Sequence, residues 1–191
     1  MSNEKLPEII VFAGPNGSGK TTITKMAKVI EPYINADDIK HTNNCSDLEA
    51  AQIAEKMRHK AIEQKISFTF ETVLSTDRNL SLLKRAKSEG YFIRCIYVLT
   101  SDVNINISRV IARQLSGGHG VPEDKIRSRY EKALKLLPQL IEICDILHIY
   151  DNTIIPFRIF KKRKNEAFIW ENEFWDKSKI KELIGKNRSS S

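Results

Sequence analysis

A segment near the start of the chain combines glycine, lysine and threonine at a spacing that suits phosphate chemistry. Residues 14–21, GPNGSGKT, match the pattern G-x-x-x-x-G-K-[ST]. Its three glycines allow the backbone to curl, so that several N–H groups can converge on phosphate oxygens. The ammonium of Lys20 can reach the β- and γ-phosphates, and the hydroxyl of Thr21 can be a ligand of Mg²⁺. The motif therefore predicts a nucleoside triphosphate site, with ATP and Mg²⁺ as the expected ligands.

The sequence around this motif suits the strand–loop–helix arrangement that a phosphate-binding loop needs. The apolar run EIIVFA, residues 8–13, predicts a central strand buried on both faces. A helix is expected from Lys20 to about Ile30, and its N-terminus adds partial positive charge at the phosphates. Thr22 can help by packing or hydrogen bonding, or it can act only as a helix cap. The residues expected to bind ATP are Gly14, Pro15, Asn16, Gly17, Ser18, Gly19, Lys20, Thr21 and Thr22.

The motif by itself does not determine the reaction, because hydrolases, motors and kinases share it. A hydrolase usually adds an apolar strand that ends in a metal-binding aspartate. ILHIYD ends in Asp151, but it lies late in the chain, where a peripheral strand is expected. ISFTFE ends in Glu71 and is expected beside the loop strand, and the sequence contains neither an LSGGQ-type signature nor a guanine-reading NKxD motif. Hydrolysis is therefore less favoured but stays open.

Three carboxylates at the ends of predicted strands are candidates for contact with a second substrate. Asp37 and Asp38 follow the short run YINA, residues 33–36, and Glu71 lies in ISFTFETVL, residues 66–74. Ligands of open α/β sheets bind beyond the carboxyl ends of the strands. A carboxylate there can accept the proton of an attacking hydroxyl. Each of these acids could instead be a helix cap or a solvated surface group.

Two arginines four residues apart suit a lid that closes over the phosphates. Arg109 and Arg113 share one face of an expected helix, directly before the segment SGGHG. Their charge could stabilise a phosphoryl group during transfer, or both could simply be solvated. His119, between glycines, could contact phosphate or substrate, or only favour the turn. Arg127 and Arg129 are weaker candidates for the same role.

Strand and helix patterns alternate along the chain, which predicts an α/β fold. We expect a P-loop NTPase of the nucleoside-kinase-like type, a three-layer sandwich with a mainly parallel sheet. After Pro156 the pattern changes to two short strands joined at Lys164-Asn165 and a final helix, which form a small C-terminal appendage. Pro138 should kink or split the helix expected over residues 121–145. The other expected strands are residues 91–100 and 146–152, and the other expected helices are residues 46–65, 76–90 and 102–115.

Length and charge distinguish two parts of the chain. The 191 residues suit one domain, residues 1–155, with the appendage at residues 156–191. The net charge is +7, and the appendage holds ten Lys/Arg against five Asp/Glu, which is +5 of this total. Because basic segments often bind polyanions, nucleic acid is not excluded as a partner of this tail. The final residues, KNRSSS, are expected to be disordered.

The composition argues against several other classes of protein. No apolar run approaches the roughly 18 residues needed to cross a bilayer, and the N-terminus does not resemble a secretory leader. A cytoplasmic protein without membrane contact is therefore expected. Cys45, Cys95 and Cys144 are widely spaced and odd in number, which favours free thiols over a zinc site. The four histidines also lack metal-ligand spacing.

Five segments occur in an order that is more informative than any one of them. They are FAGPNGSGKTT, INADDI, FTFETVLS, RVIARQLSGGHGVPEDKIRSRY and IYDN, within residues 8–152. Together they resemble the zeta-toxin family of P-loop kinases, especially its shorter chromosomal members. The resemblance implies an ATP-dependent kinase that phosphorylates the sugar 3′-hydroxyl of UDP-N-acetylglucosamine. It also implies an antitoxin protein as partner, although no sequence feature demonstrates one.

The resemblance also assigns roles to individual residues. Asp37 is similar to the family's catalytic base, and Arg109 is similar to a lid arginine that stabilises the transferring phosphate. Glu71 resembles the acid that contacts the substrate, and Thr72 lies beside it. The expected catalytic set is Asp37, Arg109, the motif lysine Lys20 and the neighbouring Arg113.

The chain departs from the family pattern at two positions. Ser75 stands where the toxins have an arginine shortly after the glutamate, and His119 replaces a second lid arginine unless Arg113 supplies that charge. We expect these departures to affect the specificity for the acceptor more than the kinase chemistry. Two other functions stay open: a nucleic-acid kinase or ATPase, and an ATP-binding partner protein without transferase activity. The residues expected to contact the acceptor are Asp38, Glu71, Thr72, Ser75 and His119.

Overall fold

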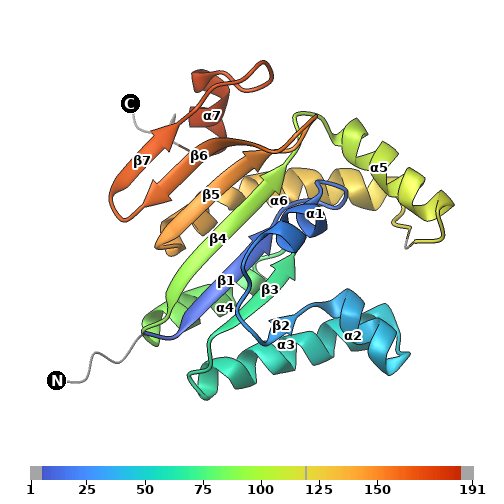
Figure 1. Ribbon diagram of the computed structural model, residues 1–191, viewed down its shortest axis with the longest axis vertical. Coiled ribbons are helices and arrows are strands. Elements are labelled where there is room, and N and C mark those ends of the chain that lie inside the picture. The colour runs from blue at the N-terminus through green and yellow to red at the C-terminus, as the bar shows by residue number, and fades with distance from the viewer. Residues whose placement is uncertain (1–5, 119, 186–191) are drawn as a thin grey trace.

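A seven-stranded sheet forms the centre of the computed structural model, which describes residues 6–118 and 120–185. The strands are β1 (Glu8–Ala13), β2 (Tyr33–Ile34), β3 (Phe68–Thr72), β4 (Phe92–Leu99), β5 (Ile146–Asp151), β6 (Phe157–Arg163) and β7 (Glu166–Ile169). They are arranged in the order β2-β3-β1-β4-β5-β6-β7 (Figure 1). The first five strands in this order run parallel, and β6 and β7 are antiparallel to their neighbours.

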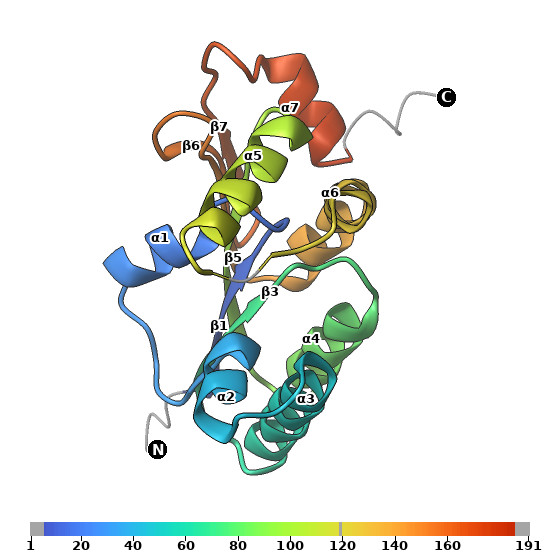
Figure 2. The ribbon, with the colours of Figure 1, turned by 90° about the vertical axis from the view of Figure 1, so that its right-hand side faces the viewer.

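Helices pack on both faces of the sheet and make the structure three-layered. They are α1 (Lys20–Met26), α2 (Ala36–Asn43), α3 (Asp47–Glu63), α4 (Arg78–Ser88), α5 (Val103–Leu115), α6 (Glu123–Ile143) and α7 (Lys177–Leu183). With the sheet seen edge-on, α3, α4, α6 and α7 lie on one side and α1 on the other (Figure 2). The expected α/β class and mainly parallel sheet are confirmed. No helix of the described residues is long and apolar enough to span a membrane.

The central position of β1 explains why residues 9–13 of this strand are all apolar. Ile9 and Val11 point into the larger core, which α3, α4 and α6 complete. Ile10 and Phe12 point to the opposite face and pack against Ile23 of α1. Because successive side chains of a strand alternate between faces, a strand covered on both sides needs a continuous apolar run. β1 therefore holds the loop that follows it at the centre of the carboxyl edge.

The segment after the expected second strand is helical, which differs from the sequence-based expectation. β2 has only two residues, and α2 begins at Ala36, so Asp37 and Asp38 lie in the first helical turn. The side chain of Asn35 caps this helix by accepting a hydrogen bond from the N–H of Asp37 at 2.9 Å. No residue of α2 is buried, so the segment lacks the apolar periodicity that would have predicted it.

Helix α6 continues through Pro138, so the helix is not split there, and the alternative expectation of a kink stays a prediction. Proline removes one backbone hydrogen bond from a helix interior. Here Ala133, Leu137 and Leu140 are fully buried in the helix around the proline. Their burial, worth about 1.5–3 kcal/mol for each leucine, offsets the cost of the missing bond. Tertiary packing therefore decides the length of this helix.

The C-terminal residues join the sheet, and this changes the position of β5. We expected β5 to be peripheral, but it lies between β4 and β6. Ile159 and Phe160 of β6 and Ile180 of α7 are buried in the same core as β1. The hairpin and helix expected after Pro156 are present as β6, β7 and α7. The division into a domain of residues 1–155 and an appendage of residues 156–191 stays a prediction.

Candidate active site

The loop between β1 and α1 has a backbone that requires its glycines. Gly14, Gly17 and Gly19 have φ angles of 140°, 74° and 91°, in the region that L-residues rarely adopt. A Cβ atom at these positions would lie 2.0 Å from the carbonyl oxygen of Val98, 2.4 Å from that of Asn106 and 2.1 Å from Nδ2 of Asn152, respectively. The loop thus needs glycine both for its conformation and for its close packing.

Several N–H groups of this loop have no hydrogen-bond acceptor among the described residues. They belong to Gly17, Gly19, Lys20 and Thr21, whereas Thr22 N–H donates to the carbonyl of Gly19 at 3.2 Å. Unpaired N–H groups that converge in a glycine-rich turn form a binding site for anions. The loop is therefore ready to hold the phosphate chain of a nucleotide.

Lys20 is held over the loop by two backbone carbonyls. Its Nζ atom donates to the oxygen of Gly14 at 2.7 Å and to that of Pro15 at 2.9 Å. Burial of the ammonium lowers the pKa of Lys20 to about 8, against the raising effects of Glu71 and Asp37, while Arg113 lowers it further. Glu71, Asp37 and Arg113 therefore lie near enough to Lys20 to act on its charge. The structure therefore brings together four of the residues selected from the sequence.

Glu71 is oriented by two donors that the sequence did not single out. Its Oε1 atom accepts hydrogen bonds from the hydroxyl of Thr24 at 2.9 Å and from that of Tyr33 at 2.6 Å. Burial, together with this bond to Glu71, raises the pKa of Tyr33. The second carboxylate oxygen, Oε2, accepts no hydrogen bond from a described residue. Glu71 is thus fixed in position with one oxygen available to a ligand.

The other predicted acceptor contacts differ in their environment. Asp37 and Asp38 are both exposed in the first turn of α2. The hydroxyl oxygen of Thr72 accepts from the N–H of Leu74 at 2.9 Å and from Nδ2 of Asn79 at 2.7 Å, so it holds the loop after β3. Ser75 is half-buried in the same loop. His119 lies outside the described residues.

The predicted arginines divide into two environments. Arg109 donates from Nη2 to the carbonyl of Thr153 at 3.0 Å, and its Nη1 is buried without a hydrogen-bond partner among the described residues. Arg113 is exposed one turn later in α5 and acts electrostatically on Lys20. Arg109 is therefore anchored to the segment after β5, whereas Arg113 is known to act on the loop lysine only through its charge.

Arg127 and Arg129 of α6 are equal candidates in the sequence, but in the structure they have different hydrogen-bond partners. Arg129 donates from Nη1 to Oδ1 of Asn16 in the phosphate-binding loop, at 3.4 Å. Arg127 donates instead to Glu123, at 2.7 and 2.9 Å, and to Asn104 at 2.9 Å on the surface. Arg129 is therefore a further cation of the site.

Two buried asparagines support the back of the loop, and sequence reasoning missed both. Nδ2 of Asn106 donates to the carbonyl of Asn16 at 2.6 Å, and Nδ2 of Asn152 donates to the carbonyl of Ser18 at 2.8 Å. By holding carbonyl groups on one side, they leave the N–H groups directed to the other. The available signal was an asparagine in an apolar context, at the end of IYDN for Asn152 and within the α5 pattern for Asn106.

Asp151, the aspartate considered for a hydrolase, is used inside the structure. It is 2% exposed and accepts hydrogen bonds from the N–H and hydroxyl of Thr153 and from Nδ2 of Asn172. Moreover, the neighbours of β1 are β3 and β4, so β5 is one strand further away. Asp151 therefore joins the C-terminal segment to β5, and this position does not favour a metal-binding role.

The site fits Mg²⁺ in the way that nucleotide sites usually do. Thr21 is exposed in the first turn of α1, directly after the loop. Among the described residues, no group of three His, Cys, Asp or Glu side chains could hold a metal ion. Mg²⁺ bound with nucleotides takes most of its ligands from phosphate and water, and only one or two from protein. A single threonine hydroxyl is consistent with that chemistry.

The fold and the loop together define a P-loop protein of the kinase type. The model of the zeta-toxin family matches residues 1–174. An uncharacterized protein of Haemophilus influenzae is 34% identical over 127 residues, which is 63% of this chain and 91% of that protein. The chain therefore belongs to the zeta-toxin family and is an ATP-dependent kinase.

Two solved structures share the fold at low sequence identity. One is a chain from the PezAT chromosomal toxin–antitoxin system of Streptococcus pneumoniae, with a TM-score of 0.59 and 18% identity, covering 95% of this chain and 84% of that one. The other is from the complex of AvrRxo1-ORF1 and ORF2 with ATP, with a TM-score of 0.72 and 14% identity, covering 99% of this chain and 66% of that one. Both support the α/β architecture described above.

Proposed function

We propose that the protein transfers the γ-phosphate of ATP to a hydroxyl group of a small acceptor. The first acceptor to test is UDP-N-acetylglucosamine, at the sugar 3′-hydroxyl, which the family resemblance suggests. The arrangement that supports transfer places Asp37 just after β2 and Glu71 of β3 beside the end of β1, next to the loop, where both act electrostatically on Lys20. A kinase needs a site for an acceptor hydroxyl, with a carboxylate beside it to take the proton, whereas a hydrolase needs no such acceptor site.

Asp37 is the proposed general base. Its carboxylate is exposed at the first turn of α2, where a bound acceptor can reach it. It takes the proton of the acceptor hydroxyl while that oxygen bonds to the γ-phosphorus and the bond to the ADP oxygen breaks. The adjacent Asp38 contacts the acceptor in this proposal without taking the proton.

Lys20, Arg109 and Arg113 are proposed to stabilise the negative charge of the transferring group. When ATP binds, Lys20 donates to β- and γ-phosphate oxygens in place of the carbonyls of Gly14 and Pro15. The negatively charged phosphate oxygens stabilise the ammonium more strongly than the carbonyl dipoles do. Arg113 approaches from α5, and the unpartnered Nη1 of Arg109 gives that side chain a donor for the same charge. Thr21 would hold Mg²⁺, which would supply positive charge that neutralises the phosphates.

Glu71 is proposed to bind the acceptor through its Oε2 atom. Because Tyr33 and Thr24 occupy only Oε1, the other oxygen can accept a hydrogen bond from a sugar hydroxyl. Thr72, Ser75 and His119 are proposed to complete the acceptor side. Ser75 and His119 differ from the family pattern. We expect this difference to change which acceptor binds, and to leave the kinase chemistry unchanged.

A transfer assay tests this proposal. Purified protein is incubated with radiolabelled γ-phosphate ATP, Mg²⁺ and a panel of nucleotide sugars, sugars and oligonucleotides. We expect the wild-type protein to form a labelled nucleotide sugar. Lys20→Ala should form none, and Asp37→Asn should have a lower kcat. Asp38→Asn is the matched control, since it removes a neighbouring exposed charge and should change KM more than kcat. Tight ATP binding with no labelled acceptor would instead support an ATP-binding protein without transferase activity.

We further propose that the protein is the toxin of a pair and has an antitoxin partner. The support is family membership and the toxin–antitoxin system named for one structural neighbour. Expression of the wild-type chain should slow growth of a bacterial host, and Lys20→Ala should not. Equal growth of both strains at equal protein levels would contradict the proposal.

A further inference from the structure

One face of the sheet over β5 to β7 is not covered by a helix of the described residues. Figure 1 looks onto this face: α1 lies in front of β1, whereas β5, β6 and β7 have no helix of the described residues in front of them. The opposite face of the same strands is buried against α6 and α7. The side chains on this open face are therefore partly exposed to solvent, and Tyr150 of β5 packs at the edge of the cluster formed with α1.

The strand register shows which side chains share this open face. His148 of β5 is paired with Lys161 of β6, and Lys161 is paired with Phe168 of β7. One step further along, Tyr150 is paired with Arg158, which contacts Trp170 just after β7. Because paired residues lie on the same side of a sheet, these rows form one surface, the basic–aromatic face. Its members are Arg94, His148, Tyr150, Arg158, Lys161, Arg163, Glu166, Phe168 and Trp170.

The aromatic rings of this face are stacked and accessible. Phe168 is 45% exposed, and its ring lies 6.1 Å from that of Trp170 with an interplanar angle of 24°. The guanidinium of Arg158 lies 4.6 Å from the Trp170 ring, and the ammonium of Lys161 lies 5.9 Å from the Phe168 ring. A flat surface that alternates rings and cations is suited to stacking against planar groups.

The charge of the face is positive on balance, because four cations (Arg94, Arg158, Lys161 and Arg163) stand against the two carboxylates of Glu8 and Glu166. Arg158 and Lys161 form no ion pair with any described residue, and Arg94 pairs with Glu8 at the far end of the face, at 2.8 Å. Burial together with the positive charges of Arg158, Lys161 and Arg94 lowers the pKa of His148 to about 4. The cations are therefore close enough together to repel a further positive charge. An anionic partner would relieve this repulsion.

We propose that the basic–aromatic face binds a single-stranded nucleic acid. Unpaired bases can stack on Phe168, Trp170 and the Arg158 guanidinium, while phosphates contact Arg158 and Lys161. A duplex keeps its bases stacked inside the helix and cannot use the rings. A polyanion without bases would use only the cations. This binding is independent of the proposed phosphoryl transfer, because none of its residues belongs to the phosphate-binding loop or the acceptor side.

The test compares ligands that share charge but differ in bases. Fluorescence anisotropy measures binding of the full chain to a labelled 12-nucleotide oligouridine, to a duplex of equal length and to heparin as competitor. We expect at least tenfold tighter binding of the single strand than of the duplex. Arg158→Gln with Lys161→Gln should weaken it at least tenfold and reduce the slope of log affinity against log salt by about 1.4. Phe168→Ala should weaken it about tenfold with the salt slope unchanged.

The matched control removes the same charge from another surface. Lys132→Gln with Lys135→Gln takes two exposed cations from α6, on the other side of the sheet, and should leave binding within twofold. ATP binding and thermal unfolding show that each variant is folded. Equal losses in the two double variants, equal affinity for duplex and single strand, or a dimer in sedimentation that buries this face would each overturn the proposal.

Discussion

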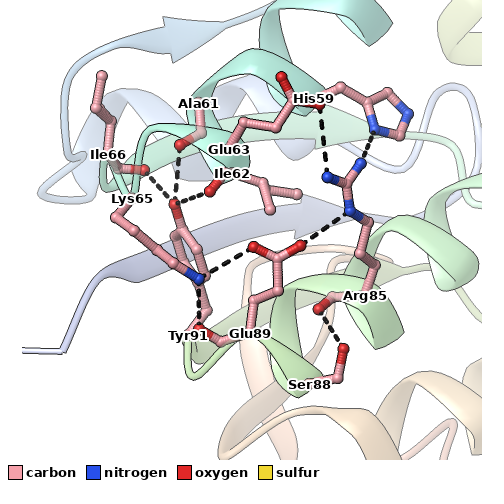
Figure 3. A network of polar contacts seen from close by, with 10 residues as sticks. All are labelled: His59, Ala61, Ile62, Glu63, Lys65, Ile66, Arg85, Ser88, Glu89 and Tyr91. Carbon is pink, nitrogen blue, oxygen red and sulfur yellow. Dashed lines mark hydrogen bonds and ion pairs between the residues drawn. The ribbon is translucent and has the colours of Figure 1, made fainter.

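Both ends of the parallel sheet contain charged and polar groups, but these groups differ in whether they have hydrogen-bond partners within the protein. At the amino end, Lys65 donates to Glu89 at 3.0 Å, and Arg85 donates to the same carboxylate at 3.0 Å (Figure 3). The hydroxyl of Tyr91 lies 2.9 Å from the carbonyl oxygen of Ala61 (Figure 3). This network joins the ends of α3 and α4 to the start of β4. Its polar groups are partnered by one another.

At the carboxyl end, by contrast, polar groups are left without protein partners. The loop N–H groups, Oε2 of Glu71 and Nη1 of Arg109 have none among the described residues. Unsatisfied polar groups destabilise a fold, so they are expected where a ligand completes them. The comparison suggests that substitutions at the carboxyl end change activity, whereas those at the amino end change stability.

Lys20→Ala should have the largest effect on activity. We expect phosphoryl transfer to fall by at least 10³-fold, because the charge at the β- and γ-phosphates is lost. The melting temperature should not fall, since the substitution removes a cation whose burial is unfavourable. Transfer kinetics and thermal unfolding measure the two effects. A large loss of stability with activity retained would reverse the comparison between the two ends.

Two glycines with similar φ angles provide the next test. Gly19 (φ 91°) lies at the carboxyl end, where a Cβ would be 2.1 Å from Asn152; Gly90 (φ 88°) lies at the amino end, with no atom within 4 Å. Gly19→Ala should weaken ATP binding by about 10²-fold by displacing the loop. Gly90→Ala should cost about 1 kcal/mol of stability from backbone strain and leave ATP binding unchanged. Calorimetric titration with ATP and denaturant unfolding separate these outcomes.

The affinity for ATP should depend on pH through Lys20. Its pKa is about 8 in the free protein, and bound phosphate raises it by adding negative charge. Below pH 8 the lysine is already protonated; above pH 8, binding must take up a proton, so affinity should fall by up to tenfold per pH unit. Lys20→Arg, which stays charged, should show a flatter profile. Identical profiles would exclude this lysine as the titrating group.

Glu89→Gln should have the smallest effect. Glu89 accepts from both Lys65 and Arg85, and these bonds lower its pKa. Since the lowered pKa stabilises the fold above the ordinary carboxyl range, the wild-type advantage should be present at pH 7 and disappear as the pH falls through that pKa. The group is solvated, so only a small decrease of the melting temperature is expected, with unchanged transfer kinetics. Any tenfold loss of activity would show that the amino end takes part in function.

The sequence predicted the elements whose signals are local. The glycine spacing identified the loop, and the apolar run of β1 indicated a strand covered on both faces. It failed where the signal is weak or is overridden by packing. α2 buries no residue and so has no periodicity, and α6 passes through Pro138 because buried leucines hold both sides. The equal ranking of Arg127 and Arg129 failed because spacing cannot show which one reaches Asn16.

The sequence by itself determined that a phosphate chain binds after the first strand, because glycine torsions and strand periodicity depend on adjacent residues. Only the tertiary structure decided what completes that site. Asn152 holds the loop from 134 residues away, and Tyr33 orients Glu71 from 38 residues away. The C-terminal hairpin extends the sheet and creates the basic–aromatic face. Such contacts join segments that are distant in the chain, and they form only when the sheet has brought those segments together.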